Sequence, residues 1–206
     1  MRDGKLIKVC GMTDAENIRA VEALGVDMMG FIFYPKSPRC VSQRLAYLPQ
    51  NAARVGVFVN VPLEEVLIQD IRYRFSMVQL HGSESPEYCR AMKEAGLRVI
   101  KAFSISDGSE LKAVKAYEGL CEMYVFDTKC SEVGGSGRSF DWSVLCAYDG
   151  QTPFLLSGGI GPGTEAKLKC FSHPRLAGYD LNSRFESAPG MKDAAAIETF
   201  LNNLEQ

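Results

Sequence analysis

Imidazole groups and paired thiols are scarce in this sequence. It contains only two histidines, His81 and His173, and no two of its seven cysteines are spaced as CxxC. Structural zinc sites usually combine closely spaced cysteines with histidines, and an odd number of cysteines cannot all be paired in disulfides. The sequence therefore argues against a metal site and against a fold stapled by disulfides.

Long apolar runs and an excess of either charge are also missing. No apolar run approaches the roughly 18 residues that a membrane helix needs. Lys and Arg number 23 against 25 Asp and Glu, a net charge of −2, which argues against a nucleic-acid or membrane-surface partner. The start MRDGKLIKVCGM lacks the apolar region and cleavage site of a signal peptide. We expect a cytoplasmic protein with no obligate protein partner.

What the sequence does contain is a repeated alternation of two patterns. Apolar, β-branched runs are each followed by a turn and then by a stretch with helical periodicity. The repeats recur about every 24 residues, a spacing that suits a strand, a helix and two short loops. The predicted strands are 6–10, 28–33, 54–59, 77–81, 98–103, 123–128, 154–158 and 178–182. The predicted helices are 14–24, 63–73, 85–95, 108–118, 141–147, 163–171 and 191–204, and residues 35–50 are expected to form a loop with a short helix.

Eight such units predict a compact (β/α)8 TIM barrel that occupies residues 1–206 as a single domain. Such barrels usually have about 250 residues, so few insertions fit in this chain. The competing architecture is a doubly wound open sheet, which usually has five or six strands, so eight units favour closure. In a barrel, the loops after the carboxyl ends of the strands surround one common mouth.

Two residues with proton-transfer chemistry end predicted strands. Cys10, in KVCGMT, ends the first strand, and Asp127, in MYVFDT, ends the sixth. Asp127 is either a solvated turn or capping residue, or a partly desolvated acid that donates a proton. Because a barrel brings both strand ends to one mouth, the functional interpretation of the pair gains weight.

Lys8 lies two residues before Cys10, so the alternation of a strand sends both side chains to the same face. A lysine in a buried strand needs a partner. Asp180, on the last strand, is a candidate because the last strand neighbours the first in a closed barrel. The same positive charge would favour the thiolate form of Cys10, whether Cys10 acts as a base or as a nucleophile.

Two glycine-rich segments have to be separated from nucleotide-binding motifs. GGSGRSFDW (134–142) lacks the first glycine and the lysine of a phosphate-binding P-loop, so we interpret it as a loop that ends at the helix cap Asp141. SGGIGPG (157–163) has Thr164 where a dinucleotide motif has its third glycine.

A site for a phosphate monoester suits the second segment better. The loops after strands seven and eight of such barrels often hold phosphate through backbone amides and the start of a short helix. Gly158 and Gly159 follow strand seven, whereas Asn182, Ser183 and Arg184 follow strand eight.

Two further polar residues follow strands. Arg39, in FYPKSPRC, is either solvated or makes a bidentate contact with a carboxylate. His81 closes the fourth predicted strand, and we interpret it as a supporting, structural histidine.

Taken in order, several of these motifs resemble one family. KVCGMT, GFIFYPKSPR, RVGVFVN, VQLHG, FDTK with GGSGRSFDW, LLSGGI and DLNS followed by Glu186 resemble phosphoribosylanthranilate isomerases, from Lys8 to about Asp193. One departure is Arg184, because the family usually has glycine there.

The resemblance implies an Amadori rearrangement in tryptophan biosynthesis. In it, N-(5-phosphoribosyl)anthranilate becomes 1-(2-carboxyphenylamino)-1-deoxyribulose 5-phosphate. The same resemblance implies that Asp127 is the general acid, that Cys10 is the general base and that Arg39 holds the anthranilate carboxylate. Asp180 and the loops after strands seven and eight would contact this small-molecule substrate. No cofactor is expected, because hydrogen moves only within the substrate.

Two alternatives stay open at this point. Another phosphosugar isomerase or epimerase on the same barrel is one; the related histidine-pathway isomerase should end its first strand with Asp rather than with Cys10. The other is a flavodoxin-like binding module, which would have an open sheet and a coloured cofactor.

Overall fold

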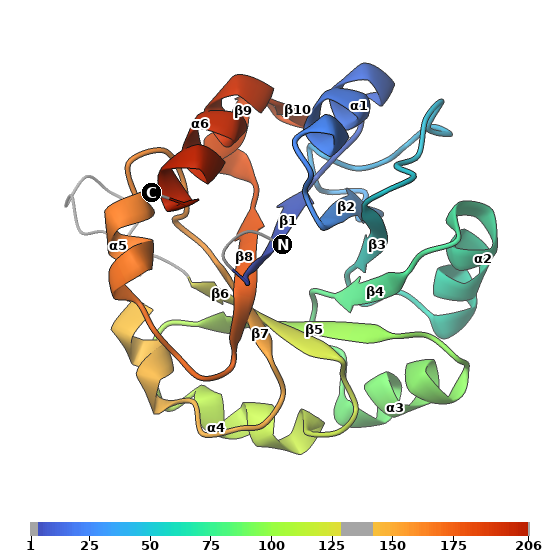
Figure 1. The fold of residues 1–206 in the computed structure, drawn as a ribbon. Helices are drawn as coiled ribbons and strands as arrows, with labels where there is room; N and C mark the ends of the chain where they lie inside the picture. Colours follow the sequence, from blue (N-terminus) through green and yellow to red (C-terminus); the bar gives the residue numbers. More distant parts are fainter. Residues whose placement is uncertain (1–3, 129–141, 206) are drawn as a thin grey trace.

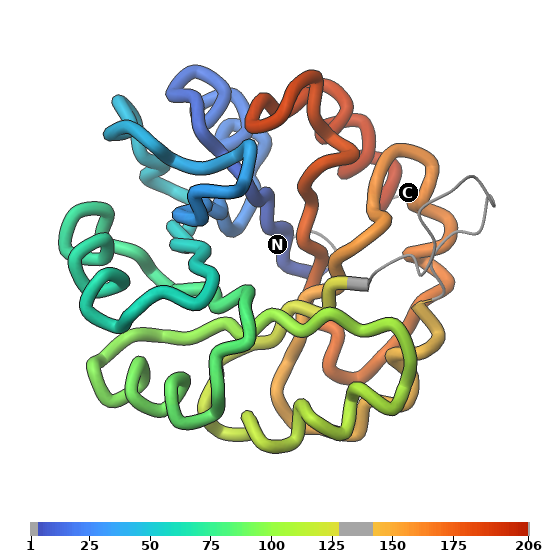
Figure 2. The backbone as a smooth tube through the Cα atoms, turned by 180° about the vertical axis from the view of Figure 1, so that it is seen from behind, coloured from blue at the N-terminus to red at the C-terminus, as the bar shows by residue number. Residues whose placement is uncertain are grey.

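The computed structural model describes residues 4–128 and 142–205. In it, eight parallel strands form a closed barrel in chain order, so β8 also pairs with β1 (Figure 1). Figure 2 shows the same closure from behind, where the blue start of the chain runs beside the orange-red segment of β8. The strands are β1 Leu6–Cys10, β2 Met28–Ile32, β3 Ala53–Phe58, β4 Met77–Leu80, β5 Val99–Ile105, β6 Met123–Thr128, β7 Phe154–Ser157 and β8 Leu176–Leu181. The predicted barrel is confirmed, and an open doubly wound sheet is excluded.

Helices surround the barrel (Figure 1). Their starts follow from local chemistry: the Asp14 carboxylate accepts a hydrogen bond from the Asn17 N–H at 2.9 Å, and Pro86 begins a helix whose capping residue is Ser85. The α-helices are α1 Ala15–Ala23, α2 Leu63–Tyr73, α3 Pro86–Glu94, α4 Leu111–Val114, α5 Glu165–Cys170 and α6 Ala194–Glu205, and the 3-10 helices are η1 Lys115–Tyr117, η2 Trp142–Ala147 and η3 Ser183–Phe185.

The strand boundaries differ from the prediction by two residues at most, but two predicted helices need larger corrections. The predicted helix 108–118 is reduced to α4 and η1. The predicted helix 191–204 begins later, because Met191–Lys192 forms strand β10, antiparallel to β9 at Glu186–Ala188. Asp193 then accepts a hydrogen bond from the Ala196 N–H at 2.9 Å and starts α6. The predicted loop 134–140 and its cap Asp141 lie outside the described residues.

Residues 35–50 contain no helix, so the short helix expected there is wrong. Three prolines, Pro35, Pro38 and Pro49, disfavour helical backbone in this segment. The end of this segment is instead held by the Glu22 carboxylate on α1. It accepts hydrogen bonds from the backbone N–H groups of Gln50 and Asn51, each at 2.6 Å.

The strands are buried on both faces, and their alternation sorts side chains between two apolar layers. One face packs against the helices, and the other fills the barrel interior. The interior group contains Cys10, Met28, Val55, Val57, Met77, Ile100, Ala102, Met123, Val125 and Leu155. Alternation with these residues sends three buried polar side chains, Lys8, Gln79 and Asp180, into the same interior.

Candidate active site

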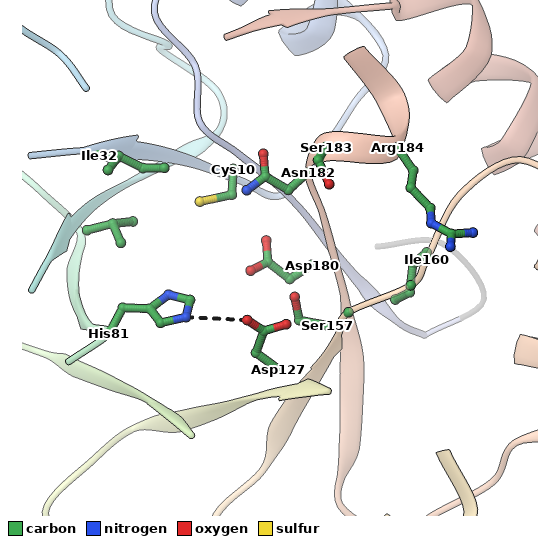
Figure 3. Close-up of a pocket in the computed structure, with 13 residues that line it drawn as sticks. Cys10, Ile32, His81, Asp127, Ser157, Ile160, Asp180, Asn182, Ser183 and Arg184 are labelled. Carbon is green, nitrogen blue, oxygen red and sulfur yellow. Dashed lines mark ion pairs between the residues drawn. The ribbon is translucent and has the colours of Figure 1, made fainter. Parts of the chain in front are cut away.

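A cavity of about 210 Å³ opens at the carboxyl ends of the strands. Figure 3 shows the Cys10 thiol and the Asp127 carboxylate facing this space from opposite sides. The residues that line it are Cys10, Ile32, Val57, His81, Asp127, Ser157, Gly158, Gly159, Ile160, Asp180, Asn182, Ser183 and Arg184. The structure thus brings most of the predicted site residues together; Lys8 and Arg39 are not among the lining residues.

Cys10 is almost fully buried, with 4% of its surface exposed. It pairs in register with Gly30 on β2, and a Cβ atom at Gly30 would lie 2.6 Å from the Cys10 Sγ. Only glycine therefore leaves room for the thiol at this point. Nothing in the local sequence around Gly30 signals this role, because the contact depends on strand pairing.

Lys8 and Asp180 form the ion pair that the closed barrel predicted. They are partners in the register between β1 and β8, and the Lys8 Nζ lies 2.9 and 3.1 Å from the two Asp180 carboxylate oxygens. Burial alone would lower the pKa of Lys8, but the attraction of Asp180 and Cys10 outweighs burial and raises it. The lysine therefore stays charged inside the barrel.

The pKa of Cys10 is raised, and burial is the largest cause. Lys8 and Lys192 each lower this pKa, while Asp180 raises it. The predicted direction of the Lys8 effect is confirmed. Desolvation of the thiolate is nevertheless the stronger influence, so the net pKa of Cys10 lies above its ordinary value.

Asp127 faces a histidine across the cavity. The His81 Nε2 lies 3.5 Å from the Asp127 Oδ2, a contact that Figure 3 marks with a dashed line. On the other side of the ring, the Gln79 Nε2 lies 3.1 Å from the His81 Nδ1. The sequence placed His81 near the mouth but did not link it to Asp127, and Gln79 was missed altogether.

Arg39 is engaged by a carboxylate of this chain. Its Nε lies 2.9 and 3.0 Å from the two Glu186 oxygens, and its Nη2 lies 2.6 Å from the Glu186 Oε2. The buried Lys192 Nζ lies 2.6 Å from the Glu186 Oε1 and 2.8 Å from the Asn182 Oδ1. Burial opposes ionisation of Glu186, but hydrogen bonds from Arg39 and Lys192 prevail and lower its pKa to about 2. Glu186 is therefore a carboxylate at neutral pH.

The loops after β7 and β8 meet at one side of the cavity. Gly158 and Gly159 have φ values of 81° and 71°, which only glycine adopts readily. Opposite them, η3 begins at Ser183, and the Arg184 side chain packs so closely on Gly161 that a Cβ atom there would lie 2.7 Å from it. Figure 3 shows the Arg184 guanidinium directed away from Cys10 and Asp127.

Residues 4–128 and 142–205 contain no group of three or more His, Cys, Asp or Glu side chains placed to hold a metal ion. Across the same described ranges, no helix is long and apolar enough to cross a membrane.

Comparison with known proteins covers nearly the whole chain. Residues 7–203 match the family model for N-(5'-phosphoribosyl)anthranilate (PRA) isomerase. An N-(5'-phosphoribosyl)anthranilate isomerase from Phocaeicola vulgatus is 54% identical over 201 residues, which cover 98% of each chain. The enzyme of that name from Parabacteroides distasonis is 43% identical over 205 residues, covering 97% of this chain and 93% of the relative.

Solved structures agree with these sequence matches. The phosphoribosylanthranilate isomerase of Thermotoga maritima superimposes with a TM-score of 0.83 at 34% identity, covering 98% of each chain. A phosphoribosylanthranilate isomerase in complex with reduced 1-(o-carboxyphenylamino)-1-deoxyribulose 5-phosphate gives a TM-score of 0.82 at 32% identity, again covering 98% of each chain.

Proposed function

Because this chain belongs to the phosphoribosylanthranilate isomerase family and is an isomerase of tryptophan biosynthesis, we propose how its pocket divides the reaction between two residues. Asp127 is the general acid and Cys10 the general base. One observation carries this assignment: the two groups reach a single cavity from β6 and β1, on opposite sides. An internal redox isomerisation needs one proton given and one removed at neighbouring positions of the substrate.

In the first step, Asp127 gives its proton to the furanose ring oxygen. The bond between that oxygen and C1′ breaks, and the anthranilate nitrogen supplies the electron pair that forms a Schiff base at C1′. Asp127 suits this step because 29% of its side-chain surface is exposed. It can therefore reach the ring oxygen of a substrate in the cavity.

In the second step, Cys10 removes the proton from C2′. The C–H electron pair moves into a C1′–C2′ double bond and the Schiff base becomes an enolamine, which tautomerises to the ketone. The thiol must first lose its proton, and the positive charge of Lys8 favours the thiolate more strongly than that of Lys192 does. Strand β1 and the contact with Gly30 hold the sulfur in place.

The phosphate would lie between the two loops after β7 and β8. Among the described residues, no backbone carbonyl accepts a hydrogen bond from the N–H of Ser183 or Arg184. Both residues line the cavity beside Gly159, whose missing side chain lets an anion approach the backbone. The amides of these loops are sufficient donors, so Arg184 in place of the usual glycine need not contact the phosphate.

The assignment of the two roles is tested by the loss of substrate fluorescence in purified variants. Removal of either group should abolish turnover, while binding of the reduced product analogue, measured by calorimetry, should persist. A variant that loses both turnover and binding would not support a role in proton transfer.

Replacing Arg39 with Met should mainly weaken substrate binding. We propose that Arg39 holds the anthranilate carboxylate with the donors that Glu186 leaves unused, since only Nε and Nη2 contact Glu186. The carboxylate is charged in the ground state and in the transition state, so KM should rise about tenfold or more while kcat changes little. Steady-state kinetics of Arg39→Met beside Arg44→Met, an exposed arginine of the same segment, separate the two effects. A fall in kcat alone would place Arg39 in the chemical step.

Removing the positive charge of Lys8 should move the activity of the enzyme to higher pH. The base form of Cys10 is the thiolate, so kcat/KM rises as pH passes the raised pKa of this thiol, and Lys8 lowers that pKa. Lys8→Met alone leaves Asp180 buried and unpaired, at a cost of about 3–5 kcal/mol, so the double variant Lys8→Met/Asp180→Asn is the one to measure. Lys8 is a larger influence on Cys10 than Asp180 is, so the net shift is still upward.

The pH profile of kcat/KM and the pH dependence of thiol alkylation both report this shift. Lys112→Met, which changes an exposed lysine on α4, should leave both profiles in place. A profile that stays in place in the double variant would show that Lys8 does not assist the base.

A further inference from the structure

Gln79 is a buried polar residue for which the two proton transfers leave no role. It lies on β4, has no exposed surface and, by the alternation of the strand, points into the barrel interior. Its Nε2 lies 3.1 Å from the His81 Nδ1. Its Oε1 has no hydrogen-bond donor among the residues that the structure describes. The nitrogen of the Gln79 amide thus has a hydrogen-bond partner, whereas its oxygen has none in the part of the chain that the structure describes.

The unused end shows which way round the amide lies. If the amide were turned over, Oε1 would face His81, and the NH2 group would occupy the position that has no partner. Both N–H donors would then be unpaired, whereas the observed orientation leaves one N–H and the carbonyl oxygen unpaired, and a buried N–H without a partner is the rarer of the two in proteins. The Gln79 Nε2 therefore donates a hydrogen bond to the His81 Nδ1.

This donor determines where His81 carries its proton. A nitrogen that accepts a hydrogen bond cannot also carry a proton in the same direction, so the proton of the neutral ring is on Nε2. The Nε2 is the nitrogen that lies 3.5 Å from the Asp127 Oδ2. His81 accordingly presents an N–H group, and no lone pair, to Asp127.

We propose that Gln79 is a positioning residue that acts through His81 to orient the carboxyl group of Asp127 toward the substrate. The His81 N–H donates to Oδ2, so Oδ1 is the oxygen left to face the substrate and to give it the proton. His81 cannot take the proton of Asp127, because its only unprotonated nitrogen, Nδ1, already accepts a hydrogen bond from the N–H of Gln79. This inference rests on the proposed role of Asp127 as general acid.

The tautomer of His81 is open to direct measurement, since the chain has only two histidines. The other, His173, is an internal reference: its Nδ1 lies 3.0 Å from the Arg175 backbone N–H and its Nε2 3.0 Å from the Tyr148 carbonyl oxygen. Backbone groups cannot exchange donor and acceptor, so His173 must carry its proton on Nε2. Long-range proton–nitrogen NMR spectra of labelled protein should show the same pattern for both rings.

Two substitutions change the hydrogen bond in different ways. Gln79→Glu keeps the size but places an acceptor beside Nδ1, so the His81 Nδ1 should become protonated while His173 stays unchanged. Gln79→Met keeps the shape and removes the bond. We expect kcat and kcat/KM to fall together, about tenfold in Gln79→Glu and less in Gln79→Met, with KM nearly constant. Ile100→Val, at the register partner of Gln79 on β5, controls for loss of packing and should leave the His81 spectrum as in the wild type.

Three results would overturn the inference. They are a proton on Nδ1 of His81 in the wild-type protein, a Gln79→Glu variant with reversed protonation and wild-type kcat, and, if Gln79→Glu does not fold, a folded Gln79→Met variant with wild-type kcat. Failure of the proposed function looks different: Asp127→Asn would keep its turnover whatever the spectrum of His81. An inactive Asp127→Asn beside fully active Gln79 variants would remove only the role of Gln79.

Discussion

Replacing Asp127 with Asn should lower kcat about a thousandfold, the size of effect expected when a general acid loses its proton. The amide has the shape of the carboxyl group, and its oxygen still accepts a hydrogen bond from the His81 Nε2, 3.5 Å from Oδ2 in the native protein. What it lacks is an acidic proton for the furanose ring oxygen. The fluorescence of the substrate should therefore persist, although the substrate and the reduced product analogue still bind.

A matched variant separates this loss from a general effect of removing a carboxylate. Asp149→Asn changes an exposed aspartate in the segment before β7, whereas the mouth of the barrel lies at the other end of that strand. This variant should keep wild-type kinetics. The acid role would be refuted by an Asp127→Asn enzyme that turns over within tenfold of the wild type.

Replacing Cys10 with Ser should abolish turnover to a similar or greater extent. The space beside Gly30 is tight, because a Cβ atom added to Gly30 would lie 2.6 Å from the Cys10 sulfur. Serine is slightly smaller than cysteine, so the fold should tolerate the change. A hydroxyl group is a far weaker acid than a thiol, and the burial that raises the pKa of Cys10 would disfavour an alkoxide even more. No base then remains at C2′, so kcat should fall by about 10³ to 10⁴.

The control for this variant is Cys146→Ser, because Cys146 is exposed on η2. Circular dichroism and binding of the reduced product analogue check that Cys10→Ser is folded. Substantial residual turnover with a normal isotope effect for deuterium at C2′ would mean that another group removes the proton, and the assignment of Cys10 would be lost.

Much of the fold was predictable because it depends on local pattern and on general rules for parallel sheets. Apolar runs in the sequence predict each strand, and eight alternating strand–helix units favour a closed barrel. Closure made Lys8 and Asp180 neighbours, and the observed register confirms that pair. Cys10 and Asp127 were identifiable because a reactive side chain at the carboxyl end of a barrel strand faces the mouth.

The local pattern failed where contacts from elsewhere in the chain decide the structure. Residues 35–50 form no helix, and the Glu22 carboxylate on α1 holds the end of this segment in place. Lys192 was assigned to a helix, but it forms strand β10, where its N–H donates to the Asn17 side-chain oxygen at 2.8 Å. Neither partner is near in sequence, so no window of residues could have revealed these contacts.

The sequence by itself therefore determined the number of strands, their order and the chemical groups at their ends, because these depend on residue type and periodicity. Only the tertiary structure decided the state of those groups. Burial outweighs Lys8 and raises the pKa of Cys10, and Glu186 lies against Arg39. Gln79 meets His81 where β4 enters the mouth of the barrel. Desolvation and hydrogen-bond polarity depend on what surrounds an atom in three dimensions, and those surroundings exist only once the barrel has closed.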